Sequence, residues 1–120
     1  MNLTQRLEIM EHSHTNMLYI GVKTEFVGYH RWMEAPEKVL FLRDYHRHLF
    51  KVEAIFAVNH SNRDREFFMT KEELDKFITK KYKDKYFEFS CELIAESIAK
   101  EFGAIFVKVS EDDENYGLYF

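Results

Sequence analysis

YHRHLFKVEAIFAV, which spans residues 45–58, is the segment around which the rest of this chain is organised. Side chains two residues apart on an extended strand point to the same face of the sheet. One face of this segment is therefore apolar from Phe50 to Val58, and His46 and His48 lie at its beginning. The opposite face mixes charged with apolar residues. The segment predicts a strand with one buried face that ends in two neighbouring imidazoles.

Residues 18–32 alternate in the same way and predict a second strand, whose mostly apolar face ends in His30. A connection of about fifteen residues follows, and it contains the only proline of the chain, Pro36. If the next strand returns antiparallel, its beginning lies beside the end of this one. His30 then meets His46 and His48 at the same end of the same sheet face.

Three converging imidazoles predict a metal site. Neutral imidazole is a good ligand for Zn²⁺, and three protein ligands leave a fourth position open for water or substrate. Zinc is favoured over magnesium or calcium because nothing nearby supplies the oxygen-rich shell that those ions prefer. The alternative is that His-x-His on a strand is ordinary polar surface.

The rest of the chain predicts two helices followed by two strands. Thr70 and Glu73 have the spacing of a capping box, and Ser90 and Gly103 are typical of a helix start and end. Leu93, Ile94, Ile98 and Phe102 are expected to face inward along the second helix. The expected elements after residue 58 are a turn at 59–64, a possible short strand at 65–69, a helix at 71–82, a charged linker at 80–85, a helix at 90–103, a strand at 104–111, a hairpin turn at 112–115 and a strand at 116–120. This order indicates an α+β fold, an antiparallel sheet with helices on one face.

Length and composition limit the classes of protein. The 120 residues suit one domain, which we place at 18–120 after a polar tail at 1–17 that includes His12 and His14. A net charge of −4 with mixed signs does not favour nucleic acid as a partner. The single Cys91 excludes an intramolecular disulfide and favours a reducing compartment. No apolar run is long enough for a membrane span, so we expect a cytoplasmic protein.

Glu111 is a second candidate for chemistry, because it follows three apolar residues on the buried face of its strand. A carboxylate there could accept paired hydrogen bonds from the guanidine-like edge of a pterin or a guanine. The alternative is that Glu111 belongs to a solvated acidic turn. Glu92, in the first turn of a helix, is typical of a capping partner. Cys91 has two readings, a thiol with a lowered pKa at a helix N-terminus or a small packed side chain.

Four motifs together resemble the family of 6-pyruvoyl-tetrahydropterin synthase and 6-carboxytetrahydropterin synthase. FVGYH at 26–30 resembles its F-x-A-x-H segment, and YHRH at 45–48 resembles its L-H-G-H segment. SCELIA at 90–95 resembles its P-T-x-E-N-x-A helix start, and VKVSE at 107–111 its V-x-V-x-E-T strand. The resemblance covers roughly residues 18–120.

This resemblance implies the tunnelling fold, in which subunits join their sheets into a barrel and assemble as trimers or hexamers. It implies Zn²⁺ on His30, His46 and His48, and a pterin-like ligand held by Glu111 with Ser90 and Glu92 nearby. The implied activity is that of a lyase on 7,8-dihydroneopterin triphosphate or a related pterin, in pterin or queuosine-precursor biosynthesis.

The chain also departs from the family at its acid and base residues. Leu42 stands where the family has its catalytic cysteine, and the Asp-His pair between the two helices has no counterpart. Tyr45, Asp44 or His14 would have to supply proton transfer; His60 lies roughly 40 Å along the strand from His46. The alternative function is a zinc-bound oligomer of the same fold that binds a pterin, a purine-like ligand or a protein without turnover.

Overall fold

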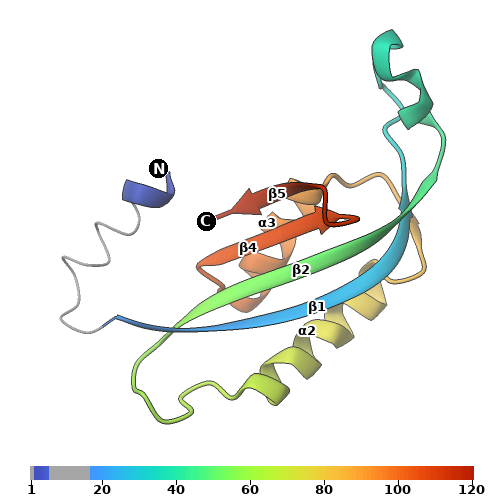
Figure 1. The fold of residues 1–120 in the computed structure, drawn as a ribbon. Coiled ribbons are helices and arrows are strands. Elements are labelled where there is room, and N and C mark those ends of the chain that lie inside the picture. The colour runs from blue at the N-terminus through green and yellow to red at the C-terminus, as the bar shows by residue number, and fades with distance from the viewer. Residues whose placement is uncertain (1, 6–16) are drawn as a thin grey trace.

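The computed structural model describes residues 2–5 and 17–120. Its centre is a curled, half-barrel sheet of five strands in the order β3-β1-β2-β4-β5, with helices packed on it (Figure 1). The predicted antiparallel sheet is wrong in one pair: β1 and β3 are parallel, so the sheet is mixed. The strands are β1 Leu18–His30, β2 His46–Val58, β3 Tyr86–Phe87, β4 Phe106–Glu111 and β5 Asn115–Tyr119. The expected α+β class is confirmed.

The long antiparallel pair β1–β2 forms as the alternation predicts. Its register runs from Leu18 opposite Val58 to His30 opposite His46. One face of the pair is the core face, and its members are Val22, Phe26, Phe50, Val52, Ala54 and Phe56. Because the side-chain period of a strand is two, this register places the histidines on the same face as the buried residues.

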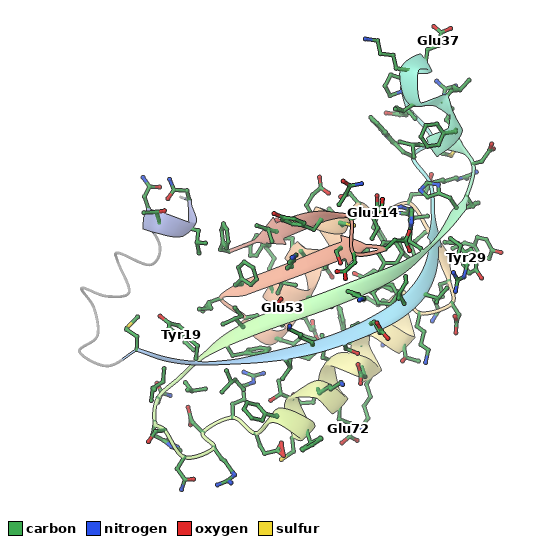
Figure 2. All side chains as sticks on the ribbon, viewed as in Figure 1. Tyr19, Tyr29, Glu37, Glu53, Glu72 and Glu114 are labelled. Atoms are coloured by element: carbon green, nitrogen blue, oxygen red, sulfur yellow. The ribbon has the colours of Figure 1, made fainter. Side chains whose placement is uncertain are left out.

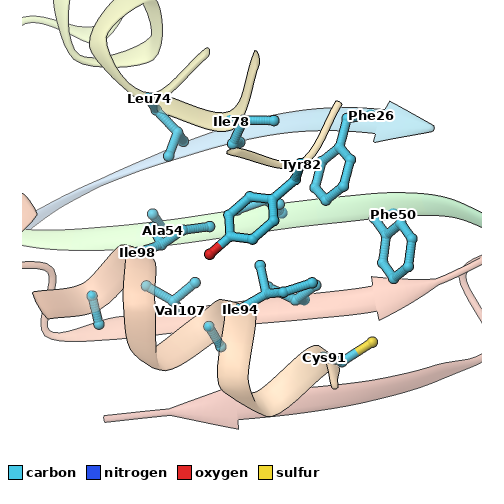
Figure 3. Close-up of a cluster of buried hydrophobic side chains, with 14 of the residues drawn as sticks. Phe26, Phe50, Ala54, Leu74, Ile78, Tyr82, Cys91, Ile94, Ile98 and Val107 are labelled. Atoms are coloured by element: carbon cyan, nitrogen blue, oxygen red, sulfur yellow. The ribbon is translucent and has the colours of Figure 1, made fainter. Parts of the chain in front are cut away.

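Two helices cover that face (Figure 1): α2 Phe67–Lys81 packs along β1, and α3 Cys91–Phe102 packs on β4 and β5. Figure 3 shows their apolar side chains directed into one cluster with the strand residues, among them Leu74, Ile94 and Ile98. These three side chains are fully buried. Each contributes about 1.5–3 kcal/mol relative to an exposed position.

The second helix begins and ends where the sequence predicts. The Ser90 hydroxyl accepts a hydrogen bond from the Leu93 backbone N–H at 3.1 Å, and Gly103 ends the helix with φ of 68°. The prediction that Leu93 faces inward is wrong, since its side chain is 45% exposed. The buried stripe runs through Cys91, Ile94 and Ile98, and Leu93 lies about 100° around the helix from Ile94.

The start of the first helix differs from the prediction. No strand forms at 65–69; α2 begins at Phe67, and the Glu66 carboxylate accepts the Met69 N–H at 3.0 Å. Thr70 is therefore inside the helix, where its hydroxyl donates to the Glu66 carbonyl at 2.7 Å, and no Thr70–Glu73 capping box forms. A carboxylate at the N-cap also suits the positive end of the helix dipole, which explains how α2 starts four residues early.

Two short elements were not predicted. A 3₁₀ helix, η1 Glu37–Arg43, lies in the β1–β2 connection, which extends away from the body as an arm with Glu37 at its far end (Figure 2). The two-residue strand β3 follows the charged linker and pairs with Tyr29 and His30. Such elements are too short to show a periodic pattern. In the described part of the chain, no helix is long and apolar enough to span a membrane.

Candidate metal centre

His30, His46 and His48 form one cluster at the arm end of the β1–β2 ladder. His30 is the last residue of β1 and pairs with His46, the first residue of β2. His48 follows two residues later on the same face. One ring nitrogen from each histidine lies within 4.8 Å of the others, so the three imidazoles could hold a metal ion.

Hydrogen bonds fix the orientation of all three rings. Each Nδ1 contacts an oxygen: the Phe89 carbonyl at 3.0 Å from His30, the Asp44 carbonyl at 2.9 Å from His46, and the Asp112 carboxylate at 2.5 Å from His48. A carbonyl can only accept a hydrogen bond, so the Nδ1 of His30 and His46 carries the proton. Each ring then keeps its lone pair on Nε2, the nitrogen available to a metal.

Glu111 adds a negative charge to the cluster. Its Oε2 atom lies 3.2 Å from Nε2 of His30 and 3.5 Å from Nε2 of His48. The position follows from register, because Glu111 is opposite Phe50 of β2 and so shares the core face. Glu111 is thus part of the site and not only of the acidic turn. A carboxylate beside three imidazoles also favours occupation by a cation.

The environment favours the neutral form of the His30 imidazole. Burial lowers the pKa of His30, and the neighbouring His46 and His48 lower it further, while the Phe89 carbonyl and Glu111 raise it. Only the neutral ring can bind a metal through Nε2. The three imidazoles and the neutral form favoured at His30 therefore fit a metal ion.

Cys91 is a packed thiol. Burial raises its pKa to about 12, and the charges of Glu111 and Glu92 add to the effect. Its Sγ lies 4.0 Å from Oε2 of Glu111, to which the thiol can donate. The reading of Cys91 as a low-pKa thiol is wrong, because burial and two carboxylates outweigh the helix N-terminus.

A pocket of about 330 Å³ adjoins the histidines. Its lining includes the residues that the family resemblance singled out for ligand binding, Ser90, Glu92 and Glu111, together with His30 and His46. The other lining residues are Arg31, Trp32, Leu42, Glu88 and Phe89. Small-molecule sites have volumes from about 300 Å³ upward and combine apolar walls with a few polar groups. This pocket has both features.

Close packing of β5 against α3 holds part of this pocket in place. Gly117 of β5 approaches the first turn of α3 so closely that a Cβ there would lie 2.4 Å from the Glu92 nitrogen and 2.7 Å from its Cα. Only glycine permits this approach. The backbone that carries Ser90 and Glu92 is thereby fixed against the sheet.

Two of the proposed proton-transfer groups, Tyr45 and Asp44, are not among the residues that line the pocket. The Tyr45 ring packs against Tyr86, which stacks on Tyr29, and Tyr29 leaves β1 on the face opposite His30. Asp44 contributes its backbone carbonyl, which accepts the hydrogen bond from Nδ1 of His46. Leu42 does line the pocket, as an apolar wall.

Of the remaining histidines, His12 and His14 lie outside the described residues. His60 follows β2 at its other end, where Nε2 lies 3.3 Å from Asp64.

Sequence reasoning missed the three oxygen atoms that orient the rings. Two are backbone carbonyls, for which side-chain patterns give no signal. The third belongs to Asp112, for which the sequence predicts only a place in a solvated acidic turn.

Comparison with known proteins supports the fold and leaves the family open. No protein-family model matches the sequence, and the comparison with curated proteins found no match. Among solved structures, the chain is similar to the uncharacterized protein WS1659 from Wolinella succinogenes, with a TM-score of 0.69 and 13% sequence identity. The match covers 88% of this chain and 98% of that one. At this identity the likeness concerns the fold alone.

Proposed function

We propose that this chain is a zinc protein whose metal lies on Nε2 of His30, His46 and His48. The observation that carries the proposal is the hydrogen bond at each Nδ1, which leaves Nε2 free in three rings whose nitrogens lie within 4.8 Å of one another. Imidazoles that are held in place by outer hydrogen-bond partners are typical of metal sites.

We further propose that the pocket takes a pterin, with 7,8-dihydroneopterin triphosphate or a related pterin as substrate. The four motifs suggest this family, and the pocket brings together Glu111, Ser90 and Glu92 beside the histidines. Glu111 would accept the paired N–H groups of the pterin's guanidine-like edge, since a carboxylate matches such a fork with two oxygens. Zn²⁺ would supply Lewis-acid polarisation of a substrate oxygen when bound. The activity would then be that of a carbon–oxygen lyase or a 6-carboxytetrahydropterin synthase-like enzyme.

The proposed assembly is a homo-oligomer, a trimer or hexamer of the tunnelling type. The strand β3 pairs with only the last two residues of β1, and β5 is the opposite edge strand of the described sheet. Exposed edges of this kind readily pair with another chain. Pairing β1 of one subunit with β5 of the next would extend the sheet around a ring.

A second function, binding without turnover, is favoured by one specific observation. Leu42 lines the pocket where a cysteine would be needed for proton transfer, and a general acid or base typically contributes about 10²–10⁴-fold in rate. In this reading the chain keeps the metal and the pocket and binds a pterin, a purine-like ligand or a protein.

Turnover separates the two functions. Zinc-loaded protein would be incubated with 7,8-dihydroneopterin triphosphate, with products followed by mass spectrometry and chelator-treated protein as control. Metal-dependent product supports the enzyme, and its loss in Glu111→Gln supports the role of that carboxylate. Pterin binding with no product supports the second function. Neither product nor binding would refute the pterin proposal, and zinc content measured on the same sample tests the metal site separately.

A further inference from the structure

The Asp112 side chain, in the turn between β4 and β5, forms a hydrogen bond with the histidine cluster. Its Oδ2 accepts from Nδ1 of His48 at 2.5 Å, and its Oδ1 accepts from the Leu49 backbone N–H at 2.9 Å. Its own backbone N–H donates to the Leu49 carbonyl at 2.8 Å. Three hydrogen bonds from one residue thus reach two consecutive residues of β2.

The backbone of this turn is unusual for residues with a side chain. Asp112 has φ of 53° and Asp113 has φ of 61°, and the Glu114 N–H donates to the Glu111 carbonyl at 3.0 Å. Two central residues with positive φ are typical of a type I′ turn, which favours glycine, asparagine or aspartate. Asp112 is held in this conformation by its bonds to β2, and its carboxylate is thereby fixed in place.

His48 differs from the other two histidines in how it is held. His30 and His46 are oriented by backbone carbonyls, which a side-chain substitution does not remove. Among the three Nδ1 hydrogen bonds, only that of His48 is made by a side chain. The orientation of this one imidazole therefore depends on the residue at position 112.

We propose that Asp112 is a positioning residue of the metal centre: its carboxylate holds the proton of His48 on Nδ1 and presents Nε2 to the metal. The inference rests on the proposed zinc site and adds to it a residue that touches neither the metal nor the pocket. A carboxylate in this place also makes the imidazole a stronger donor. The chemistry is that of a carboxylate–histidine–metal relay.

Asp113 provides a matched control in the same turn. It has the same residue type and the same sign of φ, but its carboxylate contacts Lys51 Nζ at 3.2 Å. Asparagine suits a positive φ as aspartate does, so Asp112→Asn and Asp113→Asn should both fold. In Asp112→Asn the amide can still accept from the Leu49 N–H through its oxygen, which leaves the NH₂ group facing His48. A donor there favours the tautomer with the proton on Nε2.

The first readout is metal affinity, measured by zinc titration against a chromophoric chelator, together with the visible spectrum of the Co²⁺ form. We expect Asp112→Asn to bind zinc ~10–100-fold more weakly, with an altered Co²⁺ spectrum, and Asp113→Asn to match the wild type. Equal loss in both variants would show that the turn's stability matters and not the carboxylate. Wild-type affinity in Asp112→Asn would likewise overturn the proposal.

The second readout needs no metal and keeps the test valid if the zinc site fails. Long-range ¹H–¹⁵N spectra of the imidazoles in metal-free protein, at a pH where histidine is neutral, report which nitrogen carries the proton. We expect His48 to be protonated at Nδ1 in the wild type and in Asp113→Asn, and to shift toward Nε2 in Asp112→Asn. No shift would refute the role of Asp112, whereas a shift without zinc binding by any form would refute only the metal site.

Discussion

His30 and His46 are the terminal partners of the β1–β2 ladder, and their ring centroids lie 4.6 Å apart. This pair shows how the candidate metal site is built where two long strands meet the arm that joins them. The ladder sets the distance between the two residues, and carbonyls from neighbouring loops set the angles of the rings. A third ring, two residues further along β2, completes the donor set.

Removing one ligand should abolish tight zinc binding. We expect His46→Ala and His48→Ala to lose bound zinc, because two imidazoles do not fill a tetrahedral site. Metal content after dialysis measures this, and the rise in Tm on adding zinc should vanish with it, since a ligand that binds the folded state stabilises it. His60→Ala is the control, because His60 pairs with Asp64 beyond β2 and should keep full metal content. Unchanged zinc in both cluster variants would contradict the site.

Replacing Glu111 should weaken pterin binding without unfolding the protein. A hydrogen bond to a charged group contributes about 1.5–3 kcal/mol, so Glu111→Ala should weaken binding of neopterin by roughly 10–150-fold. Quenching of pterin fluorescence measures the Kd, and circular dichroism checks the fold. Glu114→Ala, an exposed carboxylate in the same turn, is the matched control. Equal affinity in the two variants would argue against a pterin contact at Glu111.

The thiol of Cys91 should be unreactive in the folded protein. Burial raises its pKa to about 12, so the thiolate fraction at pH 8 is on the order of 1,000-fold lower than for a thiol of ordinary pKa. Alkylation by iodoacetamide in native buffer should be correspondingly slow, and fast in urea.

The same shift predicts a loss of stability in alkali. The folded-state pKa is raised, so this contribution to stability is present below the ordinary value of 9.0 and is lost as pH rises toward 12. The free energy of unfolding of the wild type should therefore fall more steeply above pH 9 than that of Cys91→Ala. Parallel profiles would show that Cys91 does not ionise on unfolding in this range.

A methyl group at position 117 should disturb the pocket through α3. We expect Gly117→Ala to lower the free energy of unfolding by about 1–3 kcal/mol, because the new Cβ would overlap the backbone of Glu92. Urea unfolding measures this. Gly21→Ala is the control, since a Cβ there lies 3.8 Å from its nearest neighbours, an ordinary contact, and should be nearly neutral. Comparable losses in both would show that the contact with Glu92 is not the cause.

The sequence pattern predicted the long strands, in which apolar and polar residues alternate regularly. Residues 18–30 and 46–58 alternate over thirteen residues each, and that length fixes both the strand type and the buried face. Ser90 and Gly103 mark the ends of α3 because their chemistry acts within one helical turn. Phe67 was misassigned because an exposed aromatic run resembles a strand, and the Glu66 cap has a weaker sequence signal than the Thr70–Glu73 pair.

The sequence by itself determined which three imidazoles meet, because strand period and an antiparallel return leave His30, His46 and His48 at one end of one face. It also placed Glu111 on that face. Only the tertiary structure decided which nitrogen each ring presents, since the Phe89 and Asp44 carbonyls and the Asp112 carboxylate come from loops that have no period. Alternation specifies the face from which a side chain projects. The angle of its ring depends on a hydrogen-bond partner that can lie as far along the chain as Asp112 lies from His48.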